Sequence, residues 1–122
     1  MPAVSDPHLK KLIRAIYKAH LDPEREGQGK KGDAVRRERT TGEPTKNVFH
    51  SQAAEDLVTA LKKALDRKRI PPLSKDDAEV ARAELDDLED ALTHPLGRGV
   101  VAANIYNSAA GRRANLVTGL RR

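Results

Sequence analysis

The chain has 122 residues, a formal net charge of +5 and an isoelectric point near 9.7. Its length allows one domain with a small core, and only 26 residues are Leu, Ile, Val or Phe, which is little above the level at which charged chains stay disordered. The absence of cysteine excludes disulfides and thiolate chemistry. No apolar run suits a membrane span or a secretory signal, so we expect a cytoplasmic protein of bacterial or phage origin.

The first predicted helix covers residues 7–20. Asp6 is a suitable N-cap and Pro7 fits the first helical position. Apolar residues follow at helical spacing, namely Leu9, Leu12, Ile13, Ile16 and Tyr17. The remaining surface of this helix carries Lys10, Lys11, Arg14 and Lys18. We therefore expect one apolar face packed on the core and one basic face in solvent.

Residues 24–49 are predicted to form a long, flexible, basic loop. The segment is rich in glycine and almost free of apolar residues, and connections of this length tend to be functional or disordered. A short helix within residues 33–39 would lack an apolar face. The stretch GQGKKG has neither the spacing of a phosphate-binding P-loop nor a preceding strand, which argues against a nucleotide site of that type.

Two further helices are predicted at residues 51–69 and from residue 75 onwards, joined by a short turn containing Pro71 and Pro72. Ser51 and Ser74 are the expected caps, and Asp77 stands where a capping box with Ser74 would place an acid. The short turn predicts an antiparallel helical hairpin. Its narrow leucine seam is also a candidate interface between copies of the chain in a homo-oligomer, formed by Leu61, Leu65, Leu85, Leu88 and Leu92.

The charge is unevenly distributed along the chain. Residues 71–94 contain eight acids and two bases, whereas residues 95–122 contain five arginines and no acid. Several acids lie near the C-terminal end of the helix that follows Ser74, where the helix dipole disfavours them. We therefore expect cations nearby, within the chain or across a dimer, either from the preceding helix (Lys62, Lys63, Arg67, Lys68) or from the tail (Arg98, Arg112, Arg113). The alternative is that these acids form a face exposed to solvent.

The last segment, residues 100–120, is predicted to form a fourth helix that Gly111 weakens. Residues 111–122 make a basic C-terminal tail. The overall expectation is one all-α domain over residues 1–122, a small four-helix domain with a central antiparallel hairpin and a long basic, Gly-rich loop between the first two helices.

No constellation typical of an enzyme, a metal site or a cofactor site is found. The four histidines lack metal-ligand spacing, and the acids of residues 86–90 are expected to face solvent rather than converge in a pocket. We therefore predict a protein without catalytic residues, metal or cofactor.

Two functions agree with the sequence. The first is a non-enzymatic accessory protein that binds nucleic acid mostly through phosphates. Its expected contacts are Lys30, Lys31, Arg36, Arg37, Arg39, Lys46, Arg98, Arg112, Arg113, Arg121 and Arg122. The alternative is a protein–protein interaction or assembly module, such as a small adaptor or phage structural component, whose loop and tail become ordered on an acidic or helical protein partner. Neither function involves a membrane.

Overall fold

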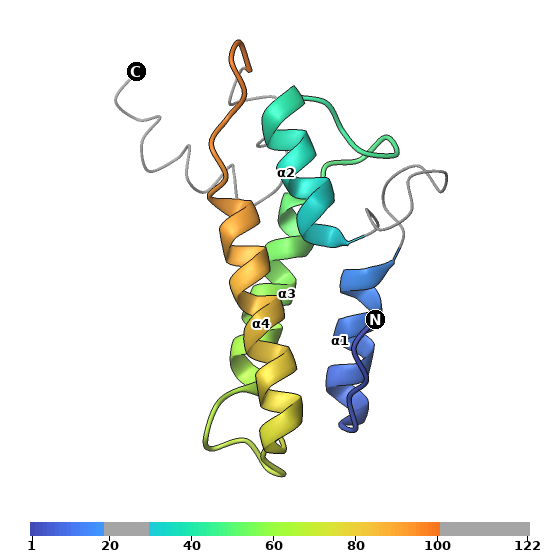
Figure 1. Ribbon diagram of the computed structural model, residues 1–122, viewed down its shortest axis with the longest axis vertical. Helices are drawn as coiled ribbons and strands as arrows, with labels where there is room; N and C mark the ends of the chain where they lie inside the picture. Colours follow the sequence, from blue (N-terminus) through green and yellow to red (C-terminus); the bar gives the residue numbers. More distant parts are fainter. Residues whose placement is uncertain (19–29, 101–122) are drawn as a thin grey trace.

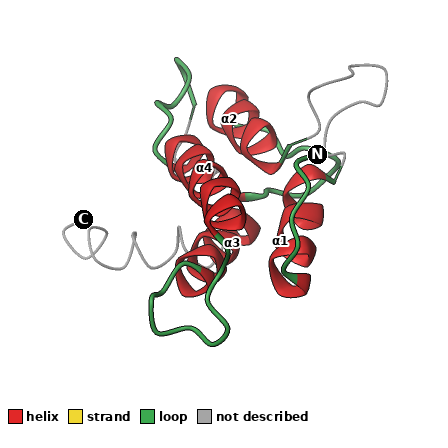
Figure 2. Cartoon of the chain, turned by 60° about the horizontal axis from the view of Figure 1, so that its bottom comes forward, coloured by secondary structure: helices red, strands yellow, loops and turns green. Residues whose placement is uncertain are grey.

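A computed structural model describes residues 1–18 and 30–100 of the chain, which contain four helices (Figure 1). These are α1 (Pro7–Tyr17), α2 (Lys31–Thr41), α3 (Ser51–Ala64) and α4 (Lys75–Leu92). The helices α3 and α4 lie side by side and run in opposite directions, while α2 packs mainly on α4 and α1 mainly on α3 (Figures 1 and 2). In this part of the chain the only strand-like feature is one isolated bridge between Thr45 and Val48. The all-α prediction is confirmed, whereas the helix predicted at residues 100–120 and the tail at residues 111–122 lie, apart from residue 100, outside the described residues.

The first helix begins as its sequence predicts. The side chain of Asp6 accepts a hydrogen bond of 2.9 Å from the amide of Leu9, and Pro7 occupies the first turn. The guanidinium of Arg69 holds the same carboxylate at 2.8 Å, which ties the start of α1 to the segment after α3. The helix ends at Tyr17 because Lys18 is extended, three residues before the predicted end.

The helix α2 corrects the prediction of a flexible loop at residues 24–49 where that loop overlaps residues 31–41, and residues 24–29 lie outside the described residues. Although α2 has no apolar stripe, it buries Ala34 and Val35 and several polar groups against its neighbours. It ends at Gly42, which adopts a left-handed φ of 76° while its amide donates to the carbonyl of Glu38 at 2.7 Å. Tertiary contacts with polar side chains therefore stabilise a helix that the apolar pattern alone does not predict.

The boundaries of α3 and α4 differ in detail from the prediction. His50, not Ser51, is the N-cap of α3, and the helix ends at Ala64 rather than at residue 69. Ser74 caps α4 as predicted, accepting from the amide of Asp77 at 3.1 Å. Asp77 does not complete a capping box; its carboxylate accepts from the amides of Ser5 at 3.0 Å and Asp6 at 2.9 Å instead. It thereby anchors the N-terminal segment to α4.

The core is small and aliphatic. Its completely buried side chains include Leu9, Ile13 and Ile16 of α1, Leu61 of α3 and Leu88 of α4. Of the five leucines predicted to join copies of the chain, Leu61 and Leu88 are inaccessible inside one chain, and Leu65, Leu85 and Leu92 pack against the same core with part of their surface exposed. Leu61 and Leu88 therefore belong to the core of one chain, and for Leu65, Leu85 and Leu92 an interface between copies stays a prediction. None of the described helices is long and apolar enough to cross a bilayer.

Candidate functional site

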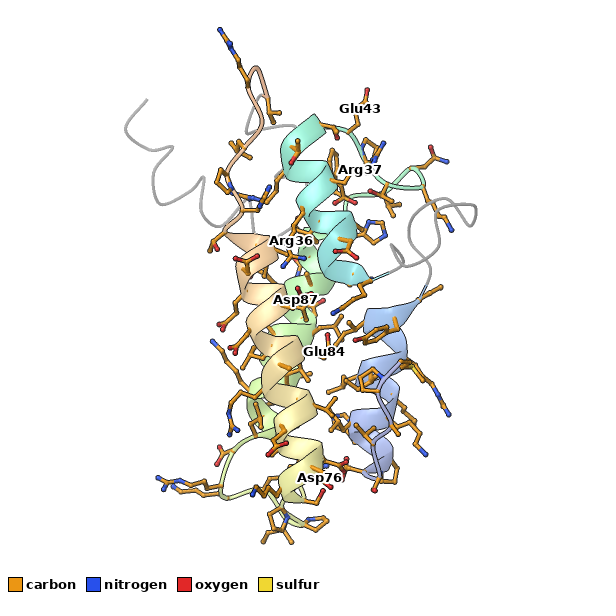
Figure 3. The ribbon with its side chains drawn as sticks, viewed as in Figure 1. Arg36, Arg37, Glu43, Asp76, Glu84 and Asp87 are labelled. Carbon is orange, nitrogen blue, oxygen red and sulfur yellow. The ribbon has the colours of Figure 1, made fainter. Side chains whose placement is uncertain are left out.

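Arg36 of α2 forms the centre of a polar contact with α4. Its Nη2 lies 2.7 Å from Oδ1 of Asp87 and 2.9 Å from Oδ2 of Asp90, and it also donates to the main-chain carbonyl of Asp87 at 2.9 Å. Figure 3 shows Arg36 and Asp87 facing each other between the two helices. On balance these carboxylates raise the pKa of Arg36 despite the opposing effect of burial. The guanidinium is fixed and its charge is used inside the chain.

Lys30 extends the contact towards α1. Its Nζ lies 3.2 Å from Oε1 of Glu84 and 3.7 Å from Oδ2 of Asp87, and 5.1 Å from the ring centre of Tyr17. The hydroxyl of Tyr17 donates to the other oxygen of Glu84 at 2.7 Å. Burial and this hydrogen bond raise the pKa of Tyr17; the pKa of Lys30 is also raised, because Glu84 and Asp87 outweigh its own burial. One acidic side of α4 thus joins α1 and α2.

The close approach of α2 to α4 depends on Gly32. A Cβ atom at this position would lie 2.5 Å from Oδ2 of Asp87 and 3.1 Å from Nη1 of Arg36. That carboxylate oxygen and Oε1 of Glu84 are buried and accept no hydrogen bond from a described residue. Both interact with the Lys30 ammonium as ion pairs instead. Any side chain larger than hydrogen at Gly32 must displace Asp87.

The other end of α2 is held by hydrogen bonds to main-chain carbonyl groups. Nε of Arg39 donates to the carbonyl oxygen of His94, just after α4, and the amide of Gly97 donates to the carbonyl of Arg39 at 2.9 Å. A Cβ atom on Gly97 would collide with the carbonyl oxygen of Thr40. Arg39 is therefore buried and serves to fix the segment that follows α4.

Glu38 of α2 is almost completely buried and organises the connection to α3. Its carboxylate accepts from the amide of His50 at 2.7 Å and from the amide of Thr45 at 3.3 Å, and it lies 2.6 Å from Nδ1 of the His50 ring. Three contacts to one carboxylate close the loop before α3. A buried carboxylate–imidazole pair also occurs in catalytic sites. The two amides that donate to Glu38 give it a structural role in this loop.

The predicted nucleic-acid contacts fall into three groups. Lys30, Arg36 and Arg39 are bound to groups within the chain, and Lys31 is mostly buried, with a pKa lowered by burial and by Lys18. Arg37 is half-buried and donates to Thr45 Oγ1 at 3.4 Å, whereas Lys46 and Arg98 are exposed. The remaining predicted contacts lie outside the described residues, namely Arg112, Arg113, Arg121 and Arg122.

A basic surface that the sequence analysis did not assign as a site lies on α1. Lys10, Lys11, Arg14 and Lys18 are all exposed, and none of them forms an ion pair with another described residue. No acid occurs between residues 7 and 18. The sequence did contain the relevant pattern, because the whole polar side of the first predicted helix is basic. The nucleic-acid contacts were assigned to the glycine-rich segment instead because it contains more arginines.

Among the described residues no group of three or more His, Asp or Glu side chains could hold a metal ion. Comparisons of the chain with protein-family models, with curated proteins and with solved structures give no match. The charge distribution of the chain itself therefore carries the information on function.

Proposed function

We propose that the protein is a non-enzymatic nucleic-acid-binding protein that contacts phosphates through the exposed face of α1 and the arginines of its C-terminal segment. The observation that carries this proposal is the α1 basic face, defined as Lys10, Lys11, Arg14 and Lys18, which no described acid neutralises. The cations at α2 support the proposal less, because Lys30 and Arg36 form ion pairs with carboxylates of α4.

The spacing of these cations suits a polyanion. Lys10 and Arg14 lie one helical turn apart on α1, and Lys18 is the extended residue directly after its end. At about 1.5 Å per helical residue, the three cations span about 12 Å. Duplex DNA carries one negative charge per roughly 1.7 Å of its axis, so several phosphates fall within that length. Arg37, Lys46, Arg98 and the arginines at 112, 113, 121 and 122 would add further phosphate contacts. Such binding positions a protein on nucleic acid without reading the base sequence.

The test is fluorescence anisotropy of a labelled duplex of random sequence, titrated with the full chain from 50 to 300 mM salt. In the test variant Lys10, Arg14 and Lys18 are all changed to Gln. In a control variant with the same net charge, Lys63, Arg67 and Lys68 are changed to Gln; these side chains are exposed at the end of α3 and just after it.

We expect the α1 variant to bind more weakly and to lose about 0.9 from the slope of log K against log salt for each phosphate contact removed. The control should retain most of the wild-type affinity and slope. Equal losses in both variants would mean that only net charge matters, which contradicts a binding site on α1.

A second candidate function is a protein–protein interaction or assembly module. A groove of about 350 Å³ between α3 and α4 supports it, with Val58 and Leu92 as apolar lining and Glu55 and Glu89 among its charged residues. The groove also contains Lys62, whose Nζ lies 3.3 Å from Oε2 of Glu89. A partner helix with an apolar face would therefore complement Val58 and Leu92. If the full chain fails to bind the duplex at 50 mM salt while Val58→Asp abolishes an association detected by sedimentation, this second function replaces the first.

A further inference from the structure

A small pocket lies between the N-terminal segment and α1. Residues 1–6 run alongside α1 (Figures 1 and 2), and a cavity of about 270 Å³ is lined by residues 1–4 together with Lys10, Ile13 and Arg14. The hydrogen bonds from the amides of Ser5 and Asp6 to Asp77 hold the segment in place. The wall of the pocket is therefore attached to α4.

The pocket combines three kinds of group. Val4 and Ile13 are buried and supply an apolar lining, while Lys10 and Arg14 stand one helical turn apart as its two charged residues. No acid lines it. The peptide groups of residues 1–4 form no hydrogen bond with other described residues, so their donors and acceptors remain available to a ligand.

These groups fit one nucleotide. A phosphate requires cations, which Lys10 and Arg14 provide; a flat ring system requires apolar walls, and its polar edges require donors and acceptors that are not already paired. The volume lies just below the usual range of about 300–1,000 Å³ for drug-sized ligands, so it suits a single base rather than a longer ligand. An alkyl chain would leave the peptide groups of the wall without partners, at a cost in affinity.

We infer that this pocket holds one unpaired base while Lys10 and Arg14 bind its phosphate, so that the protein prefers nucleic acid with an unpaired nucleotide over a blunt duplex. The inference rests on the proposed function and adds to it the kind of nucleic acid that is bound. Bases that are already unpaired enter pockets most readily because no pairing energy is lost.

The experiment compares three kinds of duplex end on one sequence by anisotropy at 100 mM salt, with the label at the far end of each duplex. One has a blunt end, one carries a single unpaired adenine nucleotide and one carries a single unpaired abasic nucleotide, with 5′ and 3′ versions of both overhangs. The abasic overhang retains the extra phosphate, so it separates the effect of the base from that of charge. Ala3→Trp fills the pocket from an exposed position, and Val48→Trp, at a residue that is 55% exposed and does not line the pocket, is the matched control.

We expect the adenine overhang, in the 5′ or the 3′ version, to bind at least about three-fold more tightly than the abasic one, a small share of the effect of a full stacking contact. Ala3→Trp should abolish this difference and leave blunt-duplex affinity unchanged, whereas Val48→Trp should retain both. Equal affinity for adenine and abasic overhangs in both versions, or a difference that survives Ala3→Trp, overturns the inference and leaves the proposed function standing. Failure of all the duplexes to bind overturns the proposed function itself.

Discussion

Replacing Asp87 by Asn tests the role of the acidic side of α4. The substitution retains the shape of the side chain and removes the charge that Arg36 contacts at 2.7 Å and Lys30 faces at 3.7 Å. Asp86, the preceding residue on the same helix, is exposed and forms no hydrogen bond or ion pair with a described residue. Asp86→Asn is therefore a control with the same chemistry and almost the same position.

The expected cost follows from the exposure of the pair. About a quarter of each side chain is accessible, 23% for Arg36 and 25% for Asp87. The contact thus lies between exposed ion pairs, which contribute about 0.2–1 kcal/mol, and buried ones, where loss of one partner costs about 3–5 kcal/mol. Arg36 retains Asp90 and the carbonyl of Asp87, so we expect Asp87→Asn to lower the free energy of unfolding by about 1–2 kcal/mol. Asp86→Asn should change it by less than about 0.5 kcal/mol, because it removes an anion from an unfavourable end of the helix.

Urea denaturation followed by far-ultraviolet circular dichroism measures both variants, at 50 mM and at 500 mM salt. The difference between the two variants should persist at high salt, since partly buried pairs are screened less than exposed ones. If the two substitutions change the unfolding free energy equally, the contact between α2 and α4 does not stabilise the fold in the way described.

Three further predictions concern single residues. Gly32→Ala should destabilise the protein by about 1 kcal/mol in the same urea assay, because its Cβ would lie 2.5 Å from Asp87 Oδ2. Ala ordinarily stabilises a helix relative to Gly by roughly that amount, so a more stable variant would refute this. Glu38→Ala should cost at least about 3 kcal/mol, since it leaves the amides of His50 and Thr45 and the ring of His50 without their carboxylate, and a cost below about 1 kcal/mol would contradict the role given to Glu38. The pKa of Asp6 is lowered from its ordinary 3.8, first by the amide of Leu9 and, against some desolvation, by Arg69. The wild type should therefore have a higher free energy of unfolding than Asp6→Asn. This difference should be complete above about pH 4 and shrink as the pH falls through the folded-state pKa. Urea titrations of both proteins between pH 2 and pH 6 measure this difference, and a difference that grows on acidification would be contrary to expectation.

Local signals in the sequence were sufficient to predict the helix starts and the buried face of α1, because the contacts that stabilise these features are also local. Asp6 followed by Pro7 fixes the start of α1, and Ser74 fixes the start of α4. The apolar spacing of α1 identified its buried face correctly, including Leu9, Ile13 and Ile16. In each case the partner of the decisive residue lies within three or four positions of it, so one segment read alone contains the necessary information.

The helix α2 could not be predicted in that way because its partners are distant in sequence. Arg36 pairs with Asp87 and Asp90, and Lys30 with Glu84. The acids of α4 did indicate that cations would lie nearby, and Lys62 contacts Glu89 at 3.3 Å as that argument predicted. The cations were expected from α3 and from the tail, however, and not from α2. Since the sequence of α2 has no apolar face, nothing in it indicated that this segment packs against α4. The contact between α3 and the acids of α4 was therefore predicted, and the position of α2 was not.

The most direct test of the central claim is a map of the nucleic-acid contact by nuclear magnetic resonance. A 16-base-pair duplex is added to the ¹⁵N-labelled full chain, and shifts of the backbone amides are followed at 50 mM salt. The account predicts that the largest shifts within residues 1–18 and 30–100 fall on Lys10, Lys11, Arg14 and Lys18. Shifts centred instead on Lys30, Arg36 and Arg39 would show that α2 leaves α4 to bind phosphates, and would contradict the account.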